Sequence, residues 1–149
     1  MPNSSLLKIA DGFWNIRGSF KVGGVVDVGT HASLARLHNG HFVLLDAYTP
    51  GASVKAEIDQ LTEQGAAIEA IINLHPFHTV HVERVHAMYP KARLYGTRRH
   101  AARFPHLPWQ SEHSEDASLH ALFADDFKFS VPPGVELVPD NENVHLSLI

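Results

Sequence analysis

The chain has 149 residues, which corresponds to a single domain over 1–149, and 44% of them are hydrophobic, enough to form a core. The net charge is −4 with the histidines neutral, and basic residues do not cluster beyond Arg98 and Arg99, which argues against nucleic acid as a partner. No cysteine is present, which excludes disulfides and thiolate ligands, and no apolar run is long enough to span a membrane.

The first third of the chain is predicted to consist mainly of strands. Apolar or alternating segments indicate strands over 6–9, 13–17, 33–37 and 42–46. Residues 22–28, with two consecutive glycines, predict a loop or an irregular strand. The pair Asn39-Gly40 is a strong hairpin signal. The run Phe42 to Asp46 is nearly continuous in apolar residues, which is typical of a strand buried on both faces.

A helix and a second buried strand are expected next. Ser53 can cap a helix over 54–64, which Gly65 would stop. The apolar segment 68–74 then predicts a strand. Two strands joined by one helix form a βαβ unit, so these two strands are expected to pair in parallel.

Shorter elements are expected in the rest of the chain. The sequence predicts helical segments over 82–88 and 98–103, strands over 92–95, 135–138 and 144–149, and a polar loop over 110–120. The last apolar residues, Leu146, Leu148 and Ile149, need a partner to cover them. We therefore expect either a homo-oligomer that covers this C-terminal strand or a larger architecture of which the chain is one half.

The most informative segment is the run from Ile71 to His81, in which an apolar strand ends in three histidines. Neutral imidazole is a common metal ligand near pH 7. His75, His78 and His81 are candidate ligands for one ion at most, zinc or iron, if His75 ends the strand and His81 starts the helix. The alternative is that they are loop and helix-cap histidines that bind no metal. His100, His106, His113 and His120 are expected at the solvated surface.

The order of these elements resembles the first half of the metallo-β-lactamase fold, the αββα sandwich of many metal-dependent hydrolases. The matching features are the opening strands, the Asn39-Gly40 hairpin, the strand ending at Asp46, the helix, and the strand that enters His75. The resemblance covers residues 6–100 well. It implies an α/β fold that is incomplete or divergent and lacks the C-terminal half, with Asp46 supporting a metal site through hydrogen bonds.

The histidine motif departs from that of the family, His-x-His-x-Asp-His. Aligned without a gap, only His75 matches; with one residue inserted, His75, His78 and His81 match and Val80 replaces the Asp. That Asp holds the second metal in the family, so the usual dinuclear site is not expected. In a later motif, Asn141 stands where the family has a ligand histidine.

Two functions remain open from the sequence. The first is a divergent metallo-β-lactamase-like protein with a degraded metal site and no dinuclear hydrolase activity. The second is a mononuclear metal-dependent hydrolase that uses His75, His78 and His81 on an unknown small-molecule substrate. Since the N-terminus lacks the basic and apolar segments of a secretory signal, we expect a cytoplasmic protein. The twelve histidines also suggest association that depends on pH.

Overall fold

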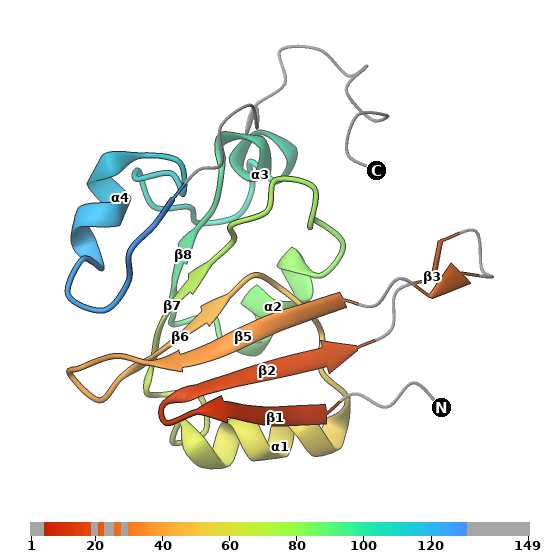
Figure 1. Ribbon diagram of the computed structural model, residues 1–149. Coiled ribbons are helices and arrows are strands. Elements are labelled where there is room, and N and C mark those ends of the chain that lie inside the picture. Colours follow the sequence, from red (N-terminus) through yellow and green to blue (C-terminus); the bar gives the residue numbers. More distant parts are fainter. Residues whose placement is uncertain (1–4, 19–20, 23–25, 28–29, 131–149) are drawn as a thin grey trace.

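The computed structural model describes residues 5–18, 21–22, 26–27 and 30–130. Its main feature is a six-stranded sheet in the order β1-β2-β5-β6-β7-β8 (Figure 1). The strands are β1 (Ser5–Ala10), β2 (Phe13–Gly18), β5 (Thr30–Arg36), β6 (Phe42–Leu45), β7 (Ile68–Ile72) and β8 (Arg93–Tyr95). A separate two-stranded sheet pairs β3 (Lys21–Val22) with β4 (Val26–Asp27).

The sheet is antiparallel at one side and parallel at the other. β1, β2, β5 and β6 pair in antiparallel fashion, whereas β6, β7 and β8 run parallel to one another. The expected hairpin connects β5 to β6, and Gly40 adopts the positive φ of 85° that this turn requires. The expected parallel pairing of the strands on either side of the first helix is confirmed, with Leu44 opposite Ile71.

Four helices complete the described part: α1 (Ala52–Leu61), α2 (Val82–Met88), α3 (Arg98–Arg103) and α4 (Ala117–Leu122). α1 and α2 lie on one face of the sheet, and α4 lies on the other (Figure 1). None of the described helices is both long and apolar enough to cross a membrane.

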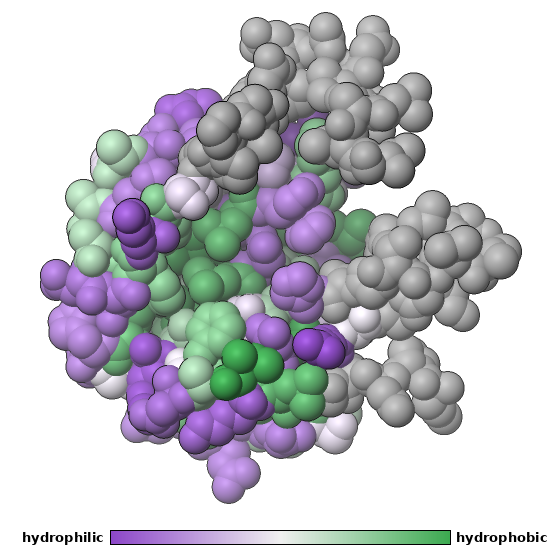
Figure 2. Space-filling model, viewed as in Figure 1, coloured by the Kyte–Doolittle hydropathy of each residue, from purple (hydrophilic) through white to green (hydrophobic). Residues whose placement is uncertain are grey.

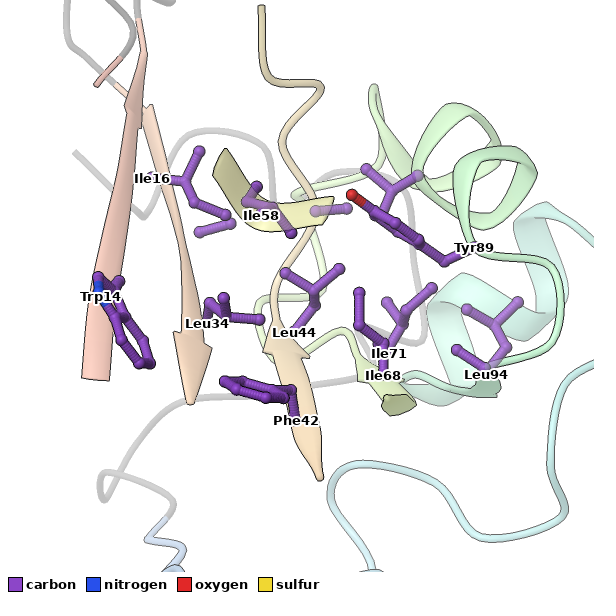
Figure 3. Packing of buried hydrophobic residues seen from close by; sticks show 14 of the residues in the cluster. Trp14, Ile16, Leu34, Phe42, Leu44, Ile58, Ile68, Ile71, Tyr89 and Leu94 are labelled. Carbon is purple, nitrogen blue, oxygen red and sulfur yellow. The ribbon is translucent and has the colours of Figure 1, made fainter. Parts of the chain in front are cut away.

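Each face of the sheet carries its own core. On the face covered by α1 and α2, buried side chains of the strands meet Val54 and Ile58 of α1 and Val85 of α2. Figure 3 shows this packing, in which side chains from β2, β5, β6 and β7 point toward α1 and Tyr89. Successive residues of β6 point to opposite faces of the sheet. Leu44 belongs to this core, and Val43 belongs to the core on the opposite face. Burial on both faces explains the continuous apolar run of β6.

The described residues cover the opposite face only in part. Leu119 and Phe123 pack there against Val43 and Tyr95. Toward the edge strand β1, Leu7 and Ile9 remain 37% and 54% exposed. Figure 2 shows this face, with hydrophobic residues along its middle and lower part and hydrophilic residues around them.

Several sequence-based expectations need correction. Ser53 does not cap α1, because Gly51 occupies the N-cap position and makes no side-chain hydrogen bond, and the helix ends at Leu61, before Gly65. The polar stretch over 110–120 is not all loop, since α4 begins at Ala117. The expected strands over 135–138 and 144–149, Asn141, and the C-terminal surface proposed for a homo-oligomer lie outside the described residues.

Candidate functional site

The candidate site lies at the carboxyl ends of the parallel strands, where α/β sheets commonly bind ligands. β7 ends at Ile72, and the segment that follows carries His75, His78 and His81 before α2 begins at Val82. β6 ends beside it at Leu45, so Asp46 stands at the same edge. We call residues 75–81 the histidine loop.

Asp46 attaches the start of the histidine loop to the neighbouring strand. Its Oδ1 atom accepts hydrogen bonds from the backbone N–H groups of Leu74, at 2.8 Å, and His75, at 3.0 Å. Its Oδ2 atom lies 4.0 Å from Nδ1 of His78. Asp46 has a φ of 61°, in the left-handed region that non-glycine residues seldom adopt. Asp46 thus supports the backbone of the histidine loop, and its expected support of a metal site stays a prediction.

His75 and His78 form a stacked pair. Their ring centroids are 4.1 Å apart and their planes differ by 22°. Nδ1 of His75 accepts a long hydrogen bond of 3.4 Å from the backbone N–H of Phe77. Burial, followed by the neighbouring His75, lowers the pKa of His78, although Asp46 acts in the opposite direction. This lowered pKa favours the neutral imidazole of His78, although its side chain is partly exposed.

His81 occupies the N-cap position of α2 and is oriented by a hydroxyl group. Its Nδ1 atom and Oγ1 of Thr49 are hydrogen-bonded at 2.8 Å, and its ring meets that of Tyr48 edge-on. Burial, and then the charge of Arg84, lower the pKa of His81. A metal at His81 would therefore have to use Nε2, since Nδ1 is already engaged.

His100 was expected at the solvated surface, and this expectation was wrong. It is fully buried in α3. Its Nδ1 atom accepts a hydrogen bond of 3.1 Å from the backbone N–H of Thr97, so Nε2 carries the proton and donates to the carbonyl oxygen of His78 at 3.2 Å. Burial lowers the pKa of His100, which favours this neutral form. His100 is thus a second support for the histidine loop.

The sequence contains a signal for the burial of His100. Thr97 is the N-cap of α3, and His100 stands at the third helical position, so the two form a reciprocal capping box. That position usually holds Glu or Gln. A Thr three residues before a His, at the start of a helical segment, could therefore have predicted an inward-facing imidazole.

The three candidate metal ligands lie on one loop but do not surround a common point. The imidazoles of His75 and His78 lie face to face, and His81 is turned toward Thr49. Within the described residues, no group of three or more His, Asp or Glu side chains is arranged to hold a metal ion. In this arrangement the residues present do not fit a three-histidine metal site, and the predicted ligand set stays a prediction.

Solved structures of similar architecture come from the metallo-β-lactamase fold. A metallo-β-lactamase from Pseudomonas aeruginosa, solved in a mono-zinc form, matches with a TM-score of 0.51 and 14% identity, over 76% of this chain and 50% of that one. A metallo-β-lactamase from Hirschia baltica matches with a TM-score of 0.54 and 15% identity, over 76% and 53% of the two chains. A fragment from Nostoc, named as a putative diflavin flavoprotein, matches with a TM-score of 0.54 and 13% identity. The match covers 78% of this chain and 52% of that one.

These matches concern the fold alone, because the sequence identities are low. No protein-family model matches the sequence, and no curated protein sequence is significantly similar to it. The chain spans about half the length of the solved structures that it matches. The resemblance inferred from the order of strands, hairpin and histidines is confirmed at the level of architecture: the chain has a divergent metallo-β-lactamase-like fold.

Proposed function

We propose that this metallo-β-lactamase-like chain binds a small molecule at the histidine loop and does not carry out two-metal hydrolysis. The observation that supports the proposal is that polar groups of the site are engaged within the protein. One oxygen of Asp46 holds two backbone N–H groups, and Nδ1 of His81 is bonded to Thr49. The histidine loop itself contains no acidic residue that could serve a second metal ion.

Metal content and hydrolysis test this proposal together. The full chain would be purified without a histidine tag, supplied with zinc or iron, and dialysed before metal analysis. Lactam, thioester and phosphodiester substrates would then be assayed. We expect fewer than two metal ions per chain and no turnover above that of a His75→Gln, His78→Gln double variant. Two bound ions together with turnover that this variant abolishes would overturn the proposal.

A mononuclear metal-dependent hydrolase is a second candidate. It is favoured by the lowered pKa values of His78 and His81, because neutral imidazoles are the form that binds metals. A single zinc or iron ion would supply a Lewis acid at this site. The stacked rings of His75 and His78 would first have to turn toward a shared point.

The two candidates differ in the expected metal stoichiometry. The hydrolase requires about one tightly bound ion per chain, held by three histidines as in other catalytic zinc sites. His78→Ala should then abolish stoichiometric binding, whereas His106→Ala, at an exposed histidine paired with Glu83, should leave it unchanged. A chain that stays free of metal and gains no thermal stability from added zinc would exclude this candidate.

A further inference from the structure

The two consecutive arginines of α3 differ in their surroundings. The guanidinium of Arg98 is paired with Glu115 at 3.0 Å and with Asp116 at 2.8 Å. Arg99, in contrast, has no carboxylate within 4.0 Å in the part of the chain that the structure describes. Its Nε atom is buried and has no hydrogen-bond partner there. A buried N–H group without an acceptor is uncommon in folded proteins and calls for a physical explanation.

Arg99 is held in place by an aromatic ring of the histidine loop. The central carbon of its guanidinium lies 4.7 Å from the centroid of the Phe77 ring, within the range of a cation–π contact. Stacking on a ring leaves the in-plane N–H groups of a guanidinium available to a bidentate acceptor. Arg99 is therefore a positioned cation whose Nε has no hydrogen-bond partner among the described residues.

Arg99 stands beside the candidate site. The Phe77 ring is 6.0 Å from that of His75, and the next residue of α3, His100, donates to the carbonyl oxygen of His78. α3 and the histidine loop lie next to each other at the same end of the sheet (Figure 1). The ring of His75 and the guanidinium of Arg99 thus both lie next to the side chain of Phe77.

We propose that Arg99 is the anion-binding residue of this site and that the ligand is a small molecule carrying a phosphate or carboxylate group. The anionic group would accept hydrogen bonds from the guanidinium of Arg99, and the adjacent imidazoles of His75 and His78 would contact the rest of the molecule. The fixed geometry of a guanidinium suits both kinds of anion, since each presents two oxygens to it. This inference rests on the proposed binding function and adds the chemical class of the ligand.

Calorimetric titration of the full chain with inorganic phosphate, and separately with acetate, tests the proposal. Arg103→Gln is a matched control, because Arg103 lies on the same helix and over the ring of Phe104, at 5.8 Å. We expect binding to weaken about tenfold in Arg99→Gln, to weaken less in Arg99→Lys, and to stay unchanged in Arg103→Gln. Stronger binding of phosphate than of acetate, or the reverse, identifies the anionic group of the natural ligand.

Equal binding by Arg99→Gln and the unaltered protein, or no saturable binding of either anion, would overturn the proposal. If Arg99→Gln does not fold, chemical modification of the unaltered protein gives the same test. Phenylglyoxal should modify Arg99 more slowly in the presence of the bound anion, with no change in the rate at Arg103, as read by mass spectrometry of peptides. Equal rates with and without the anion count against a site at Arg99.

Different results would contradict the proposed function and the anion-binding role of Arg99. Two bound metal ions with hydrolytic turnover would contradict the proposed function whatever Arg99 does. Loss of anion binding in both arginine variants alike would contradict only the role of Arg99. The metal analysis therefore tests the proposed function, and the anion titration tests the role of Arg99.

Discussion

The backbone N–H of His75 donates a hydrogen bond of 3.0 Å to Oδ1 of Asp46, and this bond joins the ends of two neighbouring parallel strands. The same oxygen accepts from Leu74. A single carboxylate oxygen thus fixes the point at which the histidine loop leaves the sheet. The left-handed backbone of Asp46 turns the chain away at the end of β6 and brings the carboxylate to this position.

Replacing Asp46 should separate the role of its oxygen from that of its charge. Asp46→Ala leaves two backbone donors without this acceptor and places alanine at a φ of 61°, so we expect it to lower the free energy of unfolding. The expected loss is about 2–4 kcal/mol. Asp46→Asn keeps an acceptor and tolerates positive φ, so it should retain most of the stability. Urea unfolding measures both, and equal losses would contradict the assigned role.

The stability of the protein should fall as the pH is lowered below about 6.5, because of His100. Burial lowers the pKa of His100 in the folded state, so the unfolded chain binds its proton more readily. The stabilisation is fully present above the unfolded pKa and is lost as the pH falls toward the folded pKa. Between its unfolded and folded pKa values, one such histidine changes the free energy of unfolding by up to about 1.4 kcal/mol per pH unit.

Urea unfolding between pH 5 and pH 8 measures this dependence. His100→Gln should be less stable at neutral pH and should show a shallower slope. His38 is a control of opposite sign, since its hydrogen bond to Asp126 raises its pKa and its contribution is lost as the pH rises. His38→Gln should therefore steepen the fall at low pH. An unchanged slope in His100→Gln would contradict the prediction.

Gly96→Ala should loosen the connection between β8 and α3. A Cβ atom at Gly96 would lie 2.6 Å from the Trp109 ring and 2.9 Å from Cβ of His100, closer than real side chains pack. We expect a loss of about 1–3 kcal/mol, as for other overpacked sites. Because Trp109 has to move, its fluorescence spectrum should also shift. A folded variant with unchanged stability and fluorescence would show that this contact is not tight.

Tyr89→Phe should cost about 1 kcal/mol of unfolding free energy, the usual value for one hydrogen bond. The hydroxyl of Tyr89 donates to Oδ1 of Asp59 at 3.1 Å, and burial with this carboxylate raises the pKa of Tyr89. Tyr48→Phe is the control, because the Tyr48 hydroxyl makes no hydrogen bond among the described residues. Thermal unfolding of both variants gives the comparison, and equal effects would argue against the bond to Asp59.

Much of the sheet could be predicted because local patterns determine it. The continuous apolar run of β6 reflects burial on two faces, and Asn39-Gly40 supplies the conformation that its hairpin needs. α2 and α3 were predicted with their observed bounds. α4 was not, because it begins inside a polar stretch and its six residues are too few to display a helical period.

The candidate site was harder to predict because tertiary contacts set its side-chain orientations. The sequence placed three histidines on one loop beside Asp46. It could not show that His75 stacks on His78, or that Thr49, far along the chain, turns the ring of His81. The burial of His100 depends in the same way on its packing against Trp109 and the loop carbonyl. Residue spacing alone therefore left open whether the three imidazoles converge, and the contacts that orient them could be seen only in the structure.

The parallel pairing of β6 with β7 has a consequence for the order in which the protein folds. The turn over residues 37–41 closes the antiparallel pair β5–β6 locally, whereas β7 can join β6 only after residues 46–67 have crossed over the sheet. Longer closures cost more chain entropy and form later. The hydrogen bonds that anchor the histidine loop to Asp46 are therefore expected to form after the hairpins, so nascent chains would acquire the candidate site only in the last stage of folding.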